Sequence, residues 1–188
     1  MAISDRAVSV LALLDSDLNN KLPIVFICHS YGGLLVKEML RCGKEIAKEY
    51  QQIIEKVRGI VFFAKPHNGS SIPQYMYSLD KLLGMTRHFA MISFLMRPSI
   101  TISELRKNES RLREMGTWFR ENIDTSKIRL RVYFEGLNTY GIRVVDESSS
   151  DPHIKGVVPI QIDANHIEIC KPLTPDFRVK KLFLLFMI

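Results

Sequence analysis

The feature that most constrains the fold is the segment at residues 27–33, which reads ICHSYGG. A short, wholly apolar run at residues 23–28 leads into this segment, and residues 34–50 after it have the composition of a helix. An apolar run with β-branched and aromatic residues is typical of a strand buried on both faces of a parallel sheet. The sequence therefore predicts a strand, a sharp turn at Ser30 and then a helix.

The rest of the chain alternates in the same way. Further strands are predicted at short apolar runs that end in turn-forming residues, and these runs lie at residues 59–64, 128–134, 141–145 and 157–162, with a loop at 146–156. Helices are predicted at residues 5–19, 34–50 and 176–188, and two or three more within 72–122, one of which opens at Ser103. Strands that alternate with helices indicate an α/β fold with a mostly parallel sheet flanked by helices. We predict one domain over residues 1–188, in which residues 72–122 form a helical, lid-like insertion.

Ser30 is the candidate nucleophile. A serine between a buried strand and a helix matches the nucleophile elbow G-x-S-x-G, in which strained backbone angles present the hydroxyl above the sheet. The positions two before and two after the serine need small residues, so that strand and helix can approach. Gly32 meets this need, and Cys28 replaces the first glycine of the motif. The helix N-terminus favours an anion, and we predict that the backbone N–H of Tyr31 donates to an oxyanion.

A serine needs a base and an acid to become a nucleophile. In this architecture the order along the chain is serine, acid, histidine, and the histidine follows the last strand. His166 follows the run at 157–162 and is the predicted base. Glu135 directly follows the run at 128–134 and is the preferred acid, with Asp146 as the alternative. Either carboxylate would orient the imidazole and stabilise its cation.

Two other histidines lie near this predicted site. His29 precedes the nucleophile, so its side chain is expected to point back into the fold and to be structural. His67 lies at the carboxyl end of the run at 59–64 and is predicted to line the substrate site, where shaping of the loop by a hydrogen bond is favoured over direct catalysis. No metal-ligand spacing or cofactor motif is present in the sequence, so we predict neither a metal nor a cofactor.

Composition limits the class of protein. The 188 residues are 46% apolar with a net charge of +6, which excludes a disordered chain. No apolar run reaches the roughly 18 residues of a membrane span. The cations are scattered without a nucleic-acid-binding signature, so no nucleic acid is expected, and peripheral contact with anionic lipid is a lesser alternative. Three widely spaced cysteines and the lack of a secretory signal indicate an intracellular, reducing compartment.

Four separated motifs together resemble the serine active site-containing protein family, lipase-like α/β-hydrolases that are distantly similar to the GPI inositol deacylases. The motifs are HSYGGLLVK at 29–37, GIVFFAKPHNGS at 59–70, FE at 134–135 and NHIEICKP at 165–172. The resemblance covers nearly the whole chain. It implies Ser30 as nucleophile, Glu135 as acid and His166 as base. It also implies an intracellular hydrolase or acyltransferase that acts on lipid esters, at the mitochondrion or endoplasmic reticulum.

The length of the chain conflicts with that fold. In a full α/β-hydrolase the nucleophile follows the fifth strand, and a loop after the third strand supplies a second oxyanion donor. Here only residues 1–22 precede the nucleophile strand. We therefore expect the C-terminal part of an α/β-hydrolase without its N-terminal strands, with an apolar sheet edge left open. A fragment, an alternative product or a truncated gene model would explain this, and a non-catalytic interaction module derived from the same fold is the alternative function.

Overall fold

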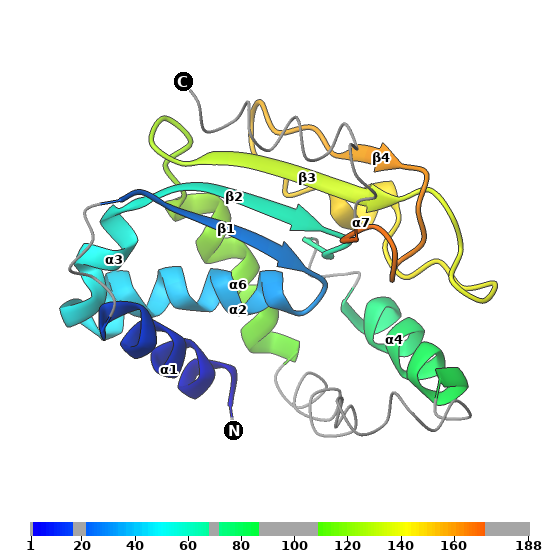
Figure 1. Ribbon diagram of the computed structural model, residues 1–188, viewed down its shortest axis with the longest axis horizontal. Coiled ribbons are helices and arrows are strands. Elements are labelled where there is room, and N and C mark those ends of the chain that lie inside the picture. Colours follow the sequence, from blue (N-terminus) through cyan, green and yellow to red (C-terminus); the bar gives the residue numbers. More distant parts are fainter. Residues whose placement is uncertain (1, 17–21, 68–71, 87–108, 172–188) are drawn as a thin grey trace.

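The computed structural model describes residues 2–16, 22–67, 72–86 and 109–171. Within them, four parallel strands form one sheet in the order β1-β2-β3-β4 (Figure 1). The strands are β1 (Ile24–His29), β2 (Val57–Phe63), β3 (Arg129–Glu135) and β4 (Ile160–Ile162). The predicted α/β class with a parallel sheet is confirmed.

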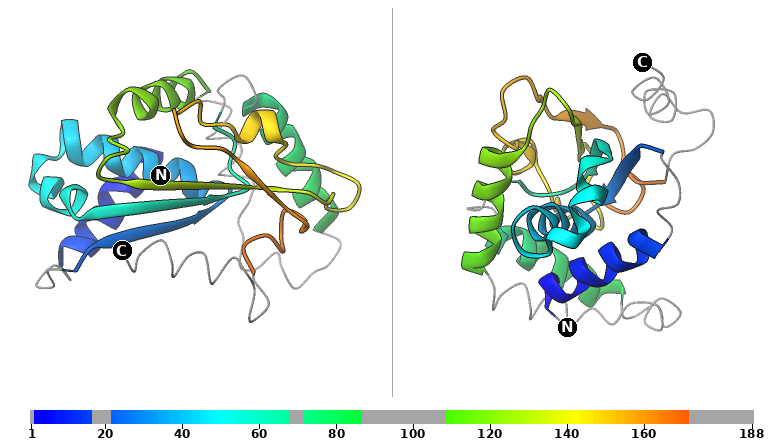
Figure 2. Two further views of the ribbon diagram at one scale, coloured as in Figure 1. Left: turned by 90° about the horizontal axis from the view of Figure 1, so that it is seen from above. Right: turned by 90° about the vertical axis from the view of Figure 1, so that its left-hand side faces the viewer.

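The helices gather mainly on one side of this sheet. They are α1 (Ile3–Ser16), α2 (Gly32–Arg41), α3 (Gln51–Glu55), α4 (Ile72–Thr86), α6 (Glu109–Asn122) and the short α7 (Glu147–Ser150). Figure 1 shows α1, α2, α3 and α6 together below the strands, while α4 lies near the ends at which the strands point. Figure 2 shows the same arrangement from two further sides. That end of a parallel sheet is where sites form in open α/β folds.

The core has one part on each face of the sheet. Along β2, Ile60 and Phe62 pack with the residues of α1, α2, α3 and α6. The alternate residues Val61 and Phe63 pack on the opposite face with Tyr133 of β3 and Tyr75 of α4. Successive side chains of a strand point to opposite faces, so the continuous apolar run of β2 is buried on both sides, as a parallel sheet requires.

The predicted strand at 141–145 is wrong. Tyr140 and Gly141 both have positive φ, 49° and 77°, and form a turn closed by a single bridge between Thr139 and Ile142. The next backbone N–H groups, at residues 144 and 145, donate to a side chain instead of to a neighbouring strand. Val144 and Val145 of this segment are therefore buried, although the segment forms no strand ladder.

Three element boundaries also differ from the prediction. The helix predicted at 34–50 is interrupted, because α2 passes into a π turn (Cys42–Ile46) that ends at the non-helical Ala47, and a 3-10 turn (Lys48–Tyr50) precedes α3. The predicted loop at 146–156 contains α7, and the strand predicted at 157–162 is reduced to β4. The helix predicted at 176–188 and the predicted helix start at Ser103 lie outside the described residues.

Only part of the predicted lid-like insertion at 72–122 is described. Its last helix, α6, packs against α2, and the ring of Phe119 lies 6.0 Å from that of Phe62 of the sheet. This helix is thus part of the layer that covers the sheet. Helix α4 is the described part of the insertion that reaches the carboxyl ends of the strands (Figure 1).

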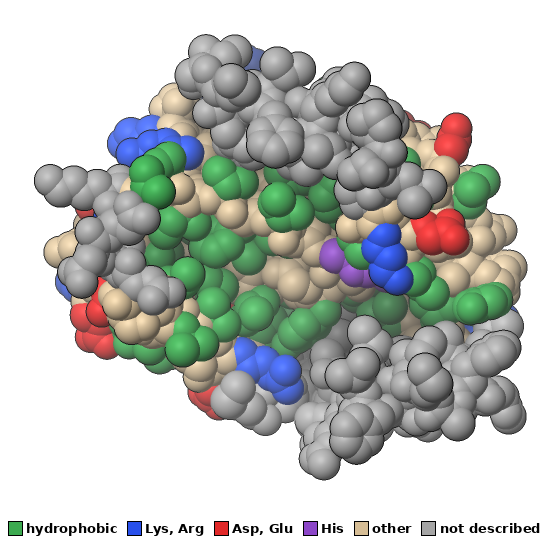
Figure 3. All heavy atoms as spheres, in the orientation of Figure 1, with side chains coloured by type: hydrophobic (Ala, Val, Ile, Leu, Met, Phe, Trp, Pro, Cys, Tyr) green, Lys and Arg blue, Asp and Glu red, His purple; other side chains and the backbone are tan. Residues whose placement is uncertain are grey.

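Strand β1 forms an open edge in the described part of the chain. It pairs with β2 on one side, and Ile27 in its middle is 62% exposed. Figure 3 shows hydrophobic side chains gathered on the face over β1 and α1. This agrees with the expected apolar edge. Of the described helices, none combines the length and the apolar character that crossing a membrane would need.

Candidate active site

The turn after β1 has strained backbone geometry at the predicted nucleophile. Ser30 has φ 53°, in the left-handed region that residues with a Cβ rarely adopt. Its N–H donates to the carbonyl of Phe63 at the end of β2 (2.9 Å), and its own carbonyl accepts from the N–H of Gly33 (3.1 Å). The backbone of Ser30 thus joins the end of the sheet to the start of α2. Strand, strained turn and helix follow one another as in a nucleophile elbow.

The glycine that allows this close packing is Gly33, and the prediction for Gly32 is wrong in this respect. A Cβ added at Gly32 would meet nothing within 4 Å. A Cβ added at Gly33 would lie 2.7 Å from Cγ and Cδ of Lys65 and 2.9 Å from Cδ1 of Phe62. The approach of α2 to the sheet therefore depends on the second glycine of the pair.

Ser30, His166 and Glu135 come together at the carboxyl ends of the strands. His166 Nε2 lies 3.1 Å from Ser30 Oγ, and His166 Nδ1 lies 3.3 Å from Glu135 Oε2. Ser30 and His166 are 136 residues apart in the sequence. A hydroxyl, an imidazole and a carboxylate in this order are the arrangement that activates a serine.

The carboxylate of Glu135 is buried and held in place by backbone groups. Its side chain is fully buried, and Oε1 accepts hydrogen bonds from the N–H groups of Val144 and Val145. Oε2 makes no hydrogen bond of its own and faces His166 Nδ1, which has no hydrogen-bond partner either. Since a buried polar group needs partners, the two backbone donors account for Oε1, and Oε2 is left facing the imidazole of His166.

Asp146, the alternative acid, has another role in the structure. Its carboxylate accepts from the N–H of Ser149 (2.8 Å) and caps the N-terminus of α7. These hydrogen bonds lower the pKa of Asp146 below its usual value. The structure brings Glu135 to His166 and leaves Asp146 at the helix cap.

Two further side chains fix the backbone of His166. Its N–H donates to Thr139 Oγ1 (2.9 Å), and its carbonyl accepts from His29 Nε2 (2.8 Å). The rings of His29 and His166 lie 4.9 Å apart. Burial, and then the proximity of His166, lower the pKa of His29 to about 4, so His29 is neutral at pH 7 and its Nε2 carries the donated proton. His29 is structural in this sense, as predicted, whereas nothing in the sequence pointed to Thr139.

Sequence reasoning also missed Tyr75. Its hydroxyl lies 2.7 Å from Ser30 Oγ, and its side chain, which comes from α4, is 1% exposed. In the sequence Tyr75 is surrounded by Met, Leu and Tyr residues, and this pattern is typical of an ordinary apolar helix face. Burial raises the pKa of Tyr75 above its usual value, so the phenol keeps its proton.

His67 is buried in a basic cluster. Its ring is 3% exposed and meets the edge of the Phe62 ring, with the centroids 4.6 Å apart. Neither ring nitrogen has a hydrogen-bond partner, and the loop is held by the backbone N–H of His67, which donates to the carbonyl of Ser149 (2.6 Å). The buried Lys37 and Lys65 lie nearby, and burial lowers the pKa of all three groups, that of Lys37 to about 7. A loop-shaping hydrogen bond is therefore made by the main chain of His67.

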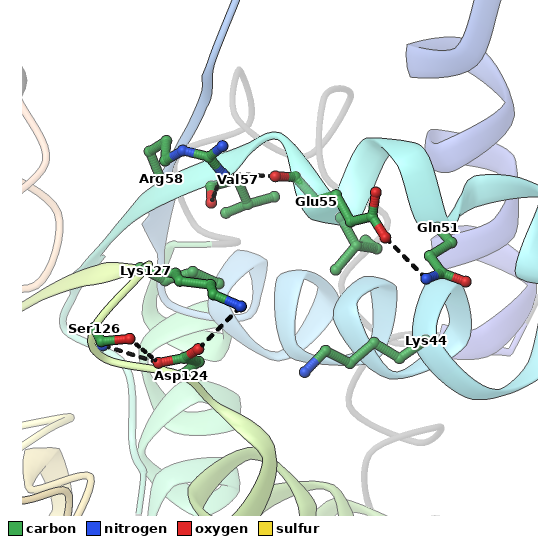
Figure 4. A pocket seen from close by; sticks show the side chains of 10 residues that line it. Lys44, Gln51, Glu55, Val57, Arg58, Asp124, Ser126 and Lys127 are labelled. Atoms are coloured by element: carbon green, nitrogen blue, oxygen red, sulfur yellow. Dashed lines mark hydrogen bonds and ion pairs between the residues drawn. The ribbon is translucent and has the colours of Figure 1, made fainter.

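A cavity of about 710 Å³ lies at the other end of the sheet (Figure 4). It opens where β2 and β3 begin, whereas Ser30 and Glu135 stand where strands end. Its charged groups already have partners: Lys127 pairs with Asp124 (3.6 Å), and Lys44 Nζ donates to the carbonyl of Asn122 (2.9 Å). This cavity is separate from the candidate active site. In the described part of the chain, no three His, Cys, Asp or Glu side chains converge as metal ligands would.

Comparisons with known proteins point in the same direction as the site. No family model matches the chain. Protein SERAC1 of Homo sapiens is 33% identical over 159 residues, which is 82% of this chain and 22% of that protein. Protein SERAC1 of Danio rerio is 30% identical over 172 residues, 88% of this chain and 23% of that protein. The chain thus spans less than a quarter of the length of the curated relatives it matches, and over that part it is a homologue of Protein SERAC1, a serine-active-site-containing protein.

Proposed function

We propose that this chain carries the catalytic residues of a serine hydrolase or acyltransferase that acts on carboxylic esters of lipids. The observation that carries the proposal is the contact chain from Ser30 Oγ to His166 Nε2 (3.1 Å) and from His166 Nδ1 to Glu135 Oε2 (3.3 Å). Homology to a serine-active-site-containing protein supports the choice of Ser30.

The reaction proceeds through an acyl-enzyme. Ser30 Oγ attacks the ester carbonyl carbon while its proton passes to His166 Nε2, and the carbonyl oxygen becomes an oxyanion. Glu135 keeps the imidazole oriented and stabilises its positive charge. The oxyanion is held by the backbone N–H of Tyr31 at the start of α2. The leaving alcohol takes the proton from His166, and a water or a second alcohol then releases the acyl group by the same steps in reverse.

The substrate class rests on the surroundings of Ser30. Tyr75, whose hydroxyl contacts Ser30 Oγ, belongs to the buried apolar cluster that also holds Phe63 and Ile169, and apolar surroundings of this kind suit an acyl chain. We propose that α4 covers this substrate as a lid. Peripheral contact with a membrane surface belongs to the same proposal, since lipid esters reside there. In this proposal His67 acts only through the loop after β2, which its backbone N–H holds by donating to the carbonyl of Ser149.

The second candidate function is a non-catalytic interaction module. The edge of β1 favours it, because β1 pairs with β2 alone in the described part of the chain, and an unpaired strand edge is a template for pairing with another chain. Ile27 of this strand is 62% exposed, and Leu22 just before the strand is 64% exposed. In that case the Ser30, His166 and Glu135 cluster is a relic of the fold.

A fluorophosphonate probe separates the two functions. The proposed hydrolase is labelled covalently at Ser30, and mass spectrometry of the modified peptide identifies the residue. Ser30→Ala removes the labelling, while Asp146→Asn, which keeps the cap of α7, does not. If the folded wild-type chain, checked by circular dichroism, takes up no probe, the hydrolase proposal fails and the interaction module remains.

A further inference from the structure

The hydroxyl of Tyr75 also contacts the nucleophile, in addition to the contacts among Ser30, His166 and Glu135. It lies 2.7 Å from Ser30 Oγ, closer than His166 Nε2 at 3.1 Å. Tyr75 belongs to α4, and it lies 45 positions after Ser30 in the chain. The reacting oxygen of Ser30 therefore has two hydrogen-bond partners on two different elements.

Counting hydrogens decides which atom donates in each contact. Glu135 Oε2 faces His166 Nδ1, so the imidazole proton resides on Nδ1, and Nε2 is an acceptor. The single hydrogen of the Ser30 hydroxyl then points to Nε2. Tyr75 is left as the donor in its contact with Ser30 Oγ, and it makes this donation from a side chain that is 1% exposed.

We propose that Tyr75 is a catalytic residue that first orients Ser30 Oγ and then donates to the oxyanion; the proposal rests on the function proposed above. As the bond from Oγ to the carbonyl carbon forms, the π electrons of the carbonyl move to its oxygen and the serine proton moves to His166. Oγ becomes an ester-like oxygen and a weaker acceptor, while the new oxyanion on the same carbon is a stronger one. The hydroxyl of Tyr75 turns to this neighbouring oxygen and keeps its own proton throughout.

This assignment adds a second donor to the one proposed for the backbone N–H of Tyr31. A second oxyanion donor usually comes from a loop that precedes the nucleophile strand, whereas the donor here comes from a helix that follows it. Donors on a developing oxyanion act in the transition state more than in the ground state, and removal of one costs about 10²–10³ in kcat. The expected signature of Tyr75 is thus a loss in kcat with little change in KM.

The core offers a matched control for the same chemical change. Tyr133 is as buried as Tyr75 and belongs to the same cluster, but its hydroxyl has no hydrogen-bond partner among the described residues. Its ring stacks on Phe63 with the centroids 5.1 Å apart, a contact that phenylalanine keeps. Tyr133→Phe therefore removes a buried hydroxyl without touching Ser30.

The experiment compares wild type, Tyr75→Phe and Tyr133→Phe in hydrolysis of p-nitrophenyl butyrate and in labelling by a fluorophosphonate probe. Tyr75→Phe is expected to lower kcat about 10²–10³-fold with KM within about threefold, while Tyr133→Phe matches wild type. A trifluoromethyl ketone, which forms a tetrahedral adduct with the serine, should bind Tyr75→Phe more weakly by the same factor as the loss in kcat. Circular dichroism and thermal unfolding check that both variants are folded.

The outcomes are distinct for the two proposals. If wild type is labelled and Tyr75→Phe keeps wild-type kcat and ketone affinity, the role of Tyr75 is refuted while the hydrolase stands. If kcat falls but ketone affinity does not, Tyr75 acts only on the ground state and its oxyanion role is refuted. If wild type is neither labelled nor active, the hydrolase proposal and the Tyr75 proposal fail together.

Discussion

Replacement of Glu135 by glutamine tests the candidate site at its most constrained point. The N–H groups of Val144 and Val145 both donate to Oε1, so a glutamine must place its amide oxygen there. Its NH₂ group then faces His166 Nδ1, 3.3 Å from the position of Oε2. Two donors cannot face each other, so His166 moves its proton to Nε2. Nε2 can then no longer accept the proton of Ser30.

The expected loss follows from that change of tautomer. In serine enzymes the corresponding acid-to-amide change lowers kcat by about 10⁴, which is about 5.5 kcal/mol of transition-state stabilisation. The stability of the fold should change little, because the amide oxygen keeps both backbone hydrogen bonds. The assay is the rate of hydrolysis of p-nitrophenyl butyrate, with urea unfolding as the check on stability.

Asp146→Asn is the matched control for this experiment. It is also an acid-to-amide change, and asparagine caps a helix as well as aspartate does, so activity and stability are expected to stay near wild type. If Asp146→Asn were the damaging change and Glu135→Gln were nearly silent, the assignment of the acid from the structure would be refuted.

Three further predictions concern the turn and the buried bases. Gly33→Ala should destabilise the fold by about 1–3 kcal/mol, because the new Cβ would lie 2.7 Å from the buried Lys65. Gly32→Ala should be neutral or stabilising by up to about 1 kcal/mol. Equal midpoints of urea unfolding for the two variants would contradict this prediction. Ser30→Gly should be more stable than Ser30→Ala by about 1 kcal/mol in the same assay, because only glycine relieves the positive φ of 53°; an equal or lower stability of the glycine variant would count against strain. The pKa of Lys37 falls from 10.5 to about 7 on folding, so the unfolded chain binds more protons at this group and stability should rise with pH from 7 to about 9. Above that pH the raised pKa values of the buried thiols of Cys28 and Cys42 oppose the rise. That rise should be smaller in Lys37→Met, and an unchanged slope would show that Lys37 stays charged.

The parts of the fold that could be predicted are those in which burial and hydrogen bonding agree. The run that became β2 is apolar throughout and lies in the middle of the sheet, so pattern and pairing coincide. The run at 141–145 also ends in buried apolar residues, Val144 and Val145, but their N–H groups bind Glu135. The pattern of apolar residues predicts burial, but it does not predict which acceptor a backbone N–H will bond to. The sequence therefore could not distinguish this run from a strand.

The candidate site divides in the same way. Ser30, His166 and Glu135 could be placed because each directly follows a predicted strand, or the turn after one, and parallel strands end at one edge. Tyr75 and Thr139 could not, because their positions depend on how α4 and a turn approach that edge. A tyrosine in an apolar helix has the same sequence pattern whether its hydroxyl meets a nucleophile or, like that of Tyr133, meets nothing.

The separation of 136 positions between Ser30 and His166 has a consequence for how the chain folds. Each parallel pairing, β1 with β2, β2 with β3 and β3 with β4, closes a long loop before its contacts form, and folds dominated by such non-local contacts are slow to form. The histidine follows the last strand of the order, so nucleophile and base meet only when every pairing is in register. A partly folded chain should therefore not react with the probe. After dilution from denaturant, labelling should recover only when the sheet is complete, and not when the chain first becomes compact. Probe labelling would then measure the fraction of chains in which all three strand pairings have formed.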